Sequence, residues 1–395
     1  MEVTLSVPFG YEANSGTEKL LRDFRDMINF CIEYALKNNI TSYARLRKSV
    51  YQEWKLRWDY STHFCHSACL VATSMLKGWR RLKRKGVAKG EKPIARKLFI
   101  CFDPQLVKFE GDRLRISVKS RKFLYIKLKF GDYQKKFIEG WKNGELKVGE
   151  VFMNGTRVLI PFRKDVDLSN PSDWIAIDVN ESNVTAVSTN PHAIQFKTNL
   201  REIRSTYFEK RRRIQRLGKN NPLTSKRLME KYSRREKNRV KDLCHKLSKS
   251  MVDFAKQHGF GIVLEDLKNM RRRINYSKRM NRRLHSLPYR KIQFYIEYKA
   301  NLSGLPVEYV DAKFSSSLCP ICGGRLASNG HRILKCKACG FEEDRDVIAC
   351  LNLLKRNPRC GGSPLPPKAT YEALAEVERI VNKKLTIRQR LTISL

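Results

Sequence analysis

The chain has 395 residues, with 80 Lys and Arg against 39 Asp and Glu, a formal net charge of +41 and a pI of about 10.0. Its content of 41% hydrophobic and 10% aromatic residues excludes a disordered chain, because it can bury real cores. So large a charge surplus repels itself unless a polyanion neutralises it, so we expect a nucleic-acid partner. No apolar run approaches the roughly 18–20 residues of a spanning helix, and the start MEVTLSVPFG lacks a signal-peptide pattern. We therefore predict a soluble, cytoplasmic protein without a membrane partner.

The first half of the chain predicts one strand, a helical block and then several short strands. VTLSVPF alternates like a strand, and residues 17–84 carry apolar side chains at helical spacing. From about residue 97 to residue 161, short alternating runs such as DRLRISV and FLYIKLKF are separated by Gly, Asp and Asn turns. This pattern predicts a small antiparallel β-barrel into which a helical block is inserted after the first strand.

A second domain is expected after the linker DLSNPSD, residues 167–173. WIAIDVN and NVTAVST have the composition of buried strands, basic amphipathic helices follow from Leu200 to Gln257, and GFGIVLEDL returns to a buried strand. Because strands and helices alternate, we expect an α/β fold here. Past Pro358, RCGGSPLPPK breaks the pattern, and TYEALAEVERIVNKKL predicts one helix in the tail.

Four of the 11 cysteines form the pattern C-x2-C-x13-C-x2-C: Cys319, Cys322, Cys336 and Cys339. Two thiolate pairs on facing turns supply the tetrahedral sulfur ligands that Zn²⁺ prefers, and a glycine follows each pair, as a tight turn needs. Since all four ligands are cysteines, no coordination position stays open, and the zinc is expected to be structural. Most other cysteines are scattered singly, which is typical of a reducing compartment.

A second cluster of potential metal ligands lies in THFCHSACL: His63, Cys65, His66 and Cys69. This segment belongs to an apolar helical stretch and has no partner pair nearby in the sequence. Core packing is therefore favoured over a second metal site.

Three carboxylates occupy positions that favour chemistry. Asp178 and Glu265 follow apolar strand runs, and Asp346 starts a helix with a buried face; they are 87 and 81 residues apart. The carboxyl ends of strands are where α/β sheets present functional groups. Carboxylates facing a polyanion would repel it unless divalent metals lay between them, and two Mg²⁺ ions can activate water and stabilise the leaving 3′ oxygen. We therefore predict a magnesium-dependent nuclease site, with Asp344 as the alternative third acid.

The order of these motifs resembles the split RuvC nuclease of the TnpB proteins, which insertion sequences encode and which are relatives of the type V CRISPR effectors. The resemblance assigns the catalytic, magnesium-binding role to Asp178, Glu265 and Asp346, and zinc binding to the four cysteines. The last motif of the family usually reads Asp-x-Asn-Ala, but Ile348 stands here where the asparagine is expected. Asp346 is therefore aligned by the following Ala349 and by the helix pattern.

The resemblance also implies a domain plan and a function. The plan is a β-barrel wedge domain (1–16 and 97–166), a helical recognition lobe (17–96), a RuvC-like, RNase H-like nuclease domain (173–318 and 341–357), a four-cysteine zinc finger (319–340) and a C-terminal tail (358–395). The implied function is that of an RNA-guided DNA endonuclease with a guide RNA and target double-stranded DNA as partners, cutting next to a short duplex motif. The alternatives are an RNA-guided DNA-binding protein without cleavage, a transposase acting directly on element DNA, and a zinc-ribbon RNA-binding protein.

Two basic runs fit such a function. Residues 78–97 contain 9 Lys or Arg in 20 positions, and Arg271–Arg283 contains 7 in 13. A guide RNA or its heteroduplex with DNA would order these runs, and Trp79 and Tyr276 are placed to stack on bases. The alternatives are a solvated face or loop for the charges and core packing for Trp79.

Overall fold

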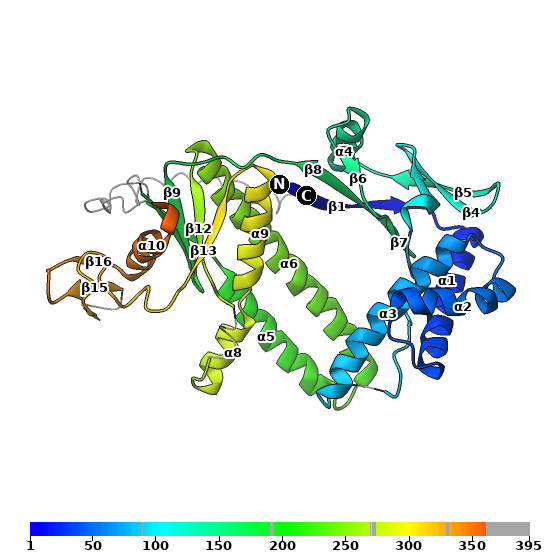
Figure 1. The fold of residues 1–395 in the computed structure, drawn as a ribbon. Coiled ribbons are helices and arrows are strands. Elements are labelled where there is room, and N and C mark those ends of the chain that lie inside the picture. Colours follow the sequence, from blue (N-terminus) through cyan, green and yellow to red (C-terminus); the bar gives the residue numbers. More distant parts are fainter. Residues whose placement is uncertain (89, 190–192, 269, 271–273, 329–331, 361–395) are drawn as a thin grey trace, which may run out of the picture. The chain divides into compact units, whose positions relative to one another are not determined.

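The computed structural model describes residues 1–88, 90–189, 193–268, 270, 274–328 and 332–360. The chain divides into two compact units, residues 2–165 and a second unit that begins at Val166 and also holds Met1 (Figure 1). The predicted tail helix lies outside the described residues. Within the described part of the chain, no helix is both long enough and apolar enough to cross a bilayer.

The first unit contains an antiparallel sheet of eight strands in the order β2-β7-β8-β1-β5-β4-β3, with β6 paired to β8. Its strands are β1 (Glu2–Tyr11), β2 (Phe99–Cys101), β3 (Val107–Phe109), β4 (Arg113–Lys119), β5 (Lys122–Lys129), β6 (Lys147–Val148), β7 (Phe152–Asn154) and β8 (Arg157–Asp165). The predicted short strands are therefore confirmed. The expected barrel is not seen, because the described pairings do not join β2 to β3 and the sheet stays open. Both outer strands have only three residues, which leaves little backbone for closure.

The helical block predicted after the first strand is also confirmed. It consists of α1 (Ser15–Lys37), α2 (Tyr43–Arg57) and α3 (Thr62–Arg84), and a 3₁₀ turn, η1 (Pro104–Leu106), follows β2. The Asn14 side chain starts α1 by accepting a hydrogen bond from the backbone N–H of Thr17 at 2.9 Å. Helix residues such as Phe24 share one hydrophobic core with sheet residues such as Phe9 and Ile160. This unit therefore folds around a single core.

One helix of this unit was not expected. Helix α4 (Asp132–Lys142) lies where only short strands and turns were predicted. Its apolar residues Tyr133, Phe137 and Trp141 recur every four residues, which is helical spacing, and Gln134 accepts the hydrogen bond of the Gly131 N–H. The strand pattern on either side concealed this short helix, since eleven residues give only three turns of evidence.

The second unit is α/β, as predicted, and is built on a five-stranded sheet in the order β11-β10-β9-β12-β13. Its strands are β9 (Trp174–Val179), β10 (Asn183–Ser188), β11 (Ala193–Lys197), β12 (Gly261–Glu265) and β13 (Val307–Val310). Strand β10 runs antiparallel to both β9 and β11, whereas β12 runs parallel to both β9 and β13. The helices are α5 (Leu200–Leu217), α6 (Pro222–Gln257), α8 (Lys278–Ser286), α9 (Tyr289–Leu302) and α10 (Arg345–Arg356), followed by η2 (Pro358–Cys360).

Helices cover both faces of this sheet. Because side chains alternate along a strand, Ile175 and Ile177 of β9 join the core under α6 and α9, whereas Trp174 and Ala176 join the core under α10. Figure 1 shows α10 against one face of the β9–β12–β13 strands and α6 and α9 on the side of the other. The next residue on the α10 face of β9 is Asp178.

Candidate functional site

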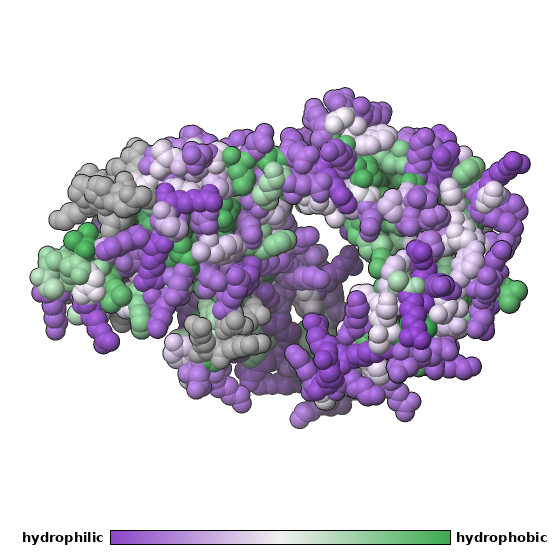
Figure 2. Space-filling model, in the orientation of Figure 1, coloured by the Kyte–Doolittle hydropathy of each residue, from purple (hydrophilic) through white to green (hydrophobic). Residues whose placement is uncertain are grey.

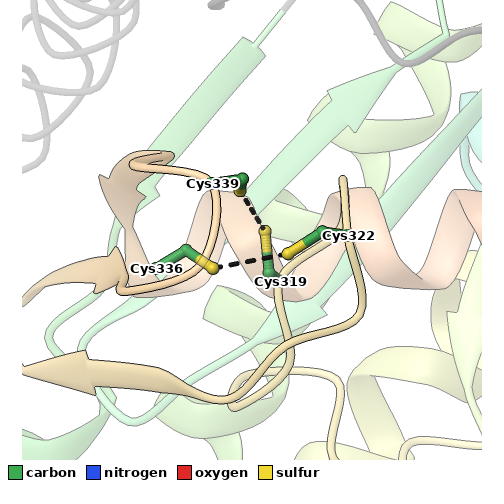
Figure 3. Close-up of side chains that lie close together, drawn as sticks. All are labelled: Cys319, Cys322, Cys336 and Cys339. Carbon is green, nitrogen blue, oxygen red and sulfur yellow. Dashed lines mark hydrogen bonds between the residues drawn. The ribbon is translucent and has the colours of Figure 1, made fainter.

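The four predicted zinc ligands lie together. Their sulfur atoms are all within 4.8 Å of one another, with Cys319 Sγ 3.6 Å from Cys339 Sγ and Cys322 Sγ 3.4 Å from Cys336 Sγ (Figure 3). Four thiolates that bind Zn²⁺ at about 2.3 Å stand about 3.8 Å apart in a tetrahedron. The cluster thus has the ligand set and the spacing to hold a zinc ion.

Two turns and a small sheet position these sulfurs. Cys319 and Cys336 each accept a backbone hydrogen bond from the glycine four residues later, Gly323 and Gly340, and both glycines have positive φ (77° and 73°). Between the turns run β14 (Leu326–Ser328) and β15 (Ile333–Cys336), and β16 (Glu342–Asp344) completes the antiparallel sheet. The backbone N–H groups of Cys339 and Ala338 lower the pKa of the Cys336 thiol to about 6, which favours the thiolate that a metal needs.

Asp178 and Glu265 lie side by side on neighbouring parallel strands. Ile177 pairs with Leu264, so the residues that follow them, Asp178 and Glu265, reach the same level of the sheet. Both acids also lie on the face that carries Ala176 and Val263, which is the face under α10. Asp178 is only 7% exposed. The strand register therefore brings together two acids that are 87 residues apart in the sequence.

Helix α10 brings Asp346 to the same place. Asp344 caps the helix, since its Oδ1 accepts the backbone N–H of Asp346 at 2.8 Å, and Asp346 lies in the buried first turn. One turn further along, Cys350 Sγ is 3.5 Å from the backbone oxygen of Thr185, the residue that pairs with Asp178 across β9 and β10. The first turn of α10 therefore lies over the strand ends that carry Asp178 and Glu265.

The pKa shifts of the buried groups indicate that the three acids are close to one another. Burial, and then the charges of Glu265 and Asp346, raise the pKa of Asp178 well above its usual range. Burial likewise raises the pKa of Glu265. Burial and the same three carboxylates raise the pKa of Cys350. The carboxylate oxygens of these three described residues do not all lie within 4.8 Å of one another. The carboxylates are therefore neighbours but do not form a closed cage.

Sequence reasoning missed the polar residues that hold the acids. Asn180 donates to Asp178 Oδ2 at 2.6 Å, Asn183 donates to Asp346 Oδ2 at 2.7 Å, and Ser315 donates to Glu265 Oε1 at 3.3 Å. The guanidinium of Arg332 pairs with both Asp344 and Asp346. Nothing in the local sequence marks these residues, although Asn180 and Asn183 flank the turn after the predicted strand.

Asn352 connects α10 to the start of the zinc finger. Its side-chain amide is buried and donates to the backbone oxygens of Ser315 at 2.7 Å and Leu318 at 2.8 Å. Leu318 precedes Cys319, the first predicted zinc ligand, and Ser315 contacts Glu265. One side chain therefore joins the helix of Asp346, the partner of Glu265 and the cysteine cluster.

Basic residues lie beside the acids. Helix α8 buries none of its residues, and its Arg283 forms an ion pair with Glu181, three positions after Asp178. The surface over α5 and α6 is mainly hydrophilic in Figure 2. Of the predicted stacking residues, Tyr276 is 64% exposed, whereas Trp79 is partly buried and its Nε1 donates to the Gly90 oxygen at 3.3 Å. Arg271, Arg272 and Arg273 of the second basic run lie outside the described residues.

Two family models match parts of the chain. Residues 289–353 match the family model described as "Cas12f1-like, TNB domain", and residues 20–117 match the one described as "Uncharacterized protein MJ0013 family". The first of these matches spans the four clustered cysteines and Asp346. In fold, the chain is similar to Cas12f1 in a solved complex of Cas12f1, sgRNA and target DNA, with a TM-score of 0.61 at 13% identity over 91% of this chain and 99% of that one.

Sequence relatives define the family. The chain is 35% identical over 112 residues to the CRISPR-associated endodeoxyribonuclease Cas12f1 of Sulfoacidibacillus thermotolerans, covering 28% of this chain and 25% of that one. It is 44% identical over 275 residues to the TnpB-like protein MJ0751 of Methanocaldococcus jannaschii, covering 68% of this chain and 99% of that protein. Since nearly the whole of that relative aligns at this identity, the chain belongs to the family of TnpB-like proteins.

Proposed function

We propose that the chain is an RNA-guided DNA endonuclease that hydrolyses phosphodiester bonds of target DNA at a RuvC-like site formed by Asp178, Glu265 and Asp346. The observation that carries the proposal is the convergence of these three acids, from β9, β12 and α10, on one face of one sheet. Membership of the TnpB-like proteins and the local similarity to a Cas12f1 endodeoxyribonuclease support it. Base pairing with a guide RNA would supply the target sequence, and the protein would read a short adjacent duplex motif.

The acids fit magnesium as the cofactor. Burial and two neighbouring carboxylates raise the pKa of Asp178. The negative charge of the ionised carboxylates is therefore not balanced by the protein alone, and a divalent cation would balance it. Carboxylate oxygens are the ligands that Mg²⁺ prefers. When bound, Mg²⁺ supplies an activated water and stabilisation of the leaving 3′ oxygen.

The chain's own residues would orient the site. Asn180 and Ser315 fix one oxygen each of Asp178 and Glu265, which leaves the remaining carboxylate oxygens for metal. Asp344 is already used as the cap of α10, where its Oδ1 accepts the backbone N–H of Asp346, which supports Asp346 as the third acid. The cysteine cluster would hold a structural Zn²⁺ next to α10.

The rest of the chain would hold the nucleic acids. In this proposal, residues 1–16 and 97–166 form the wedge domain, residues 17–96 form the recognition lobe, and residues 173–318 with 341–357 form the nuclease domain around the zinc finger of residues 319–340. The net charge of +41 supports binding of guide RNA and DNA along these parts.

One observation favours a second candidate function, RNA-guided DNA binding without cleavage. Arg332 and Asn183 already occupy Asp346, and Ile348 stands where the family usually has asparagine. A guanidinium that kept its partner in the complex would weaken metal binding at the third acid.

The test is cleavage of matched and mismatched duplex DNA by the chain purified together with its native RNA. The native chain should cut only the matched duplex and only with Mg²⁺. Asp178→Ala and Asp346→Asn should keep RNA and target binding but lose cleavage by several orders of magnitude. Asp344→Asn is the matched control, since asparagine still caps a helix, and it should cut.

Each other outcome identifies a different error. Loss of cleavage in Asp344→Asn, with Asp346→Asn active, would mean that the third acid is misassigned. Target binding without cleavage by the native chain would favour the second candidate. Cutting of element DNA without any RNA would favour a transposase.

A further inference from the structure

A second group of metal-ligating side chains lies in the first unit, outside the proposed nuclease site. His63 and His66 are three residues apart on α3, so they project from the same side of the helix, and their ring centroids are 5.3 Å apart. Asp103, from the turn between β2 and η1, faces them. One ligand atom of each residue lies within 4.8 Å of the others.

The neighbouring cysteines do not belong to this group. Cys65 and Cys69 are fully buried, and Cys69 Sγ lies 3.7 Å from Cys31 Sγ of α1. The mixed Cys and His cluster that the sequence offers is therefore divided by the helix, with the thiols in the core and the imidazoles outside it. Asp103 could not be recognised as a partner, because it lies 37 residues beyond His66.

His63 and Asp103 form a close contact that is not a hydrogen bond. Nδ1 of His63 is 3.3 Å from Asp103 Oδ2, yet this buried nitrogen has no hydrogen-bond partner among the described residues. A charged N–H···O bond is normally about 2.7–2.9 Å long. Two ligands of one tetrahedral ion, each bound at about 2.0–2.1 Å, stand about 3.3 Å apart. The observed spacing of 3.3 Å is compatible with two atoms that share an ion.

The carboxylate is also held in a suitable orientation. Oδ1 of Asp103 accepts the backbone N–H of Gln105 at 3.0 Å, which caps η1 and turns Oδ2 toward the histidines. The Arg47 guanidinium acts on the charge of His66 and would oppose a cation, and the Asp103 carboxylate offsets this only in part. All three residues are partly exposed, although the Nδ1 atom of His63 is itself buried.

We propose that His63, His66 and Asp103 bind a first-row divalent metal ion, with Zn²⁺ as the best fit. Two imidazole nitrogens and one carboxylate oxygen are ligands that Zn²⁺, Co²⁺ and Ni²⁺ accept, and three protein ligands leave one position for water. The ion would link the start of α3 to the turn after β2, two segments that are far apart in the sequence of this unit. This site is independent of the nuclease acids and of the cysteine cluster.

The decisive measurement is the zinc content of the full-length chain, freed of any affinity tag, after saturation with Zn²⁺ and removal of unbound metal. The two ligand groups predict two zinc ions per chain. His66→Ala and Asp103→Asn should each reduce this to one. The asparagine introduced by Asp103→Asn would still cap η1, so this variant separates metal loss from misfolding. His285→Ala, which changes an exposed histidine of α8, should retain two.

Cobalt identifies which site is filled. With Co²⁺ as the probe, the cysteine cluster gives sulfur-to-cobalt charge-transfer absorption, whereas a nitrogen and oxygen site gives only weak d–d bands. Cys336→Ser should lose the first signal and keep the second, and His66→Ala should do the reverse. One zinc per native chain, or two in both His66→Ala and Asp103→Asn, would overturn the proposal and leave the group as a metal-free ion pair.

Discussion

At the scale of single residues, the buried negative charge of Asp178 is the main destabilising feature. Its pKa is raised in the folded chain, so the folded state holds the proton more tightly than the unfolded state does. The resulting decrease in the free energy of unfolding is absent below the pKa of the unfolded state, about 3.9, and grows as the pH rises from there toward the pKa of the folded state. At neutral pH without magnesium, the buried carboxyl group therefore destabilises the fold.

Asp178→Asn should accordingly stabilise the magnesium-free chain. At pH 7 its melting temperature should exceed that of the native chain by about 2–4 °C for each kcal/mol gained, and the difference should shrink as the pH falls toward 4. Added Mg²⁺ should raise the melting temperature of the native chain more than that of the variant. Calorimetry at several pH values measures both effects. A variant that melts below the native chain at every pH would contradict the buried-charge argument.

Asn352 matters at the scale of elements, because its amide joins α10 to the segment before the zinc finger. Asn352→Ala would leave the Ser315 and Leu318 oxygens unpaired in a buried place, so the free energy of unfolding should fall by about 2–4 kcal/mol. Lys355→Ala is the control, since it removes a contact to the Pro320 oxygen from an exposed side chain and should cost less than about 1 kcal/mol. Urea unfolding measures both, and equal losses would refute the bridging role.

The zinc finger should affect the third acid through the same elements. Strand β16 ends at Asp344 and α10 begins at Arg345, so the finger and the helix of Asp346 share continuous backbone. Cys336→Ser should remove the metal from the cluster and reduce cleavage, while Asp178 keeps its neighbours in the sheet. Metal analysis and cleavage assays check this, and a variant with native zinc in the cluster and native activity would end the four-cysteine assignment.

Elements of the site could be predicted from the sequence, but the contacts between them could not. The buried runs ending at Asp178 and Glu265, and the helix pattern after Asp346, are local signals, and β9, β12 and α10 lie where they indicate. Ser315 reaches Glu265 only through tertiary packing, and Arg332 reaches its two carboxylate partners through the pairing of β15 with β16, so no local pattern marks them. Helix α4 and the open edges of the eight-stranded sheet were missed for a related reason, because short segments carry too little periodicity to fix pairing.

At the scale of the whole molecule, the charge of +41 sets the response to salt. RNA affinity should fall steeply with salt, by roughly 10³–10⁵ between 50 and 200 mM if about 6–10 phosphates are contacted. Replacing Lys278 and Arg279 of α8 by Gln should reduce the salt slope without unfolding, since this helix buries no residue. Lys135→Gln is the control, because Lys135 pairs with Asp132 on α4. Filter binding at several salt concentrations gives the slopes, and an unchanged slope in the α8 variant would exclude α8 from the RNA interface.

The parallel register of β9 and β12 limits which insertions and deletions the chain can accept. Because successive residues of a strand face opposite sides, one extra residue inside β12 would turn Glu265 away from Asp178 and toward the core under α6 and α9. The turn between α5 and α6, at residues 218–221, also lies between the two acids in sequence but outside the sheet, so its length can change without moving either acid. A single alanine inserted after Ile262 should therefore abolish cleavage, whereas one inserted after Asn220 should preserve it. Length variation between Asp178 and Glu265 should accordingly accumulate in turns outside the sheet, while the number of residues within each strand stays fixed.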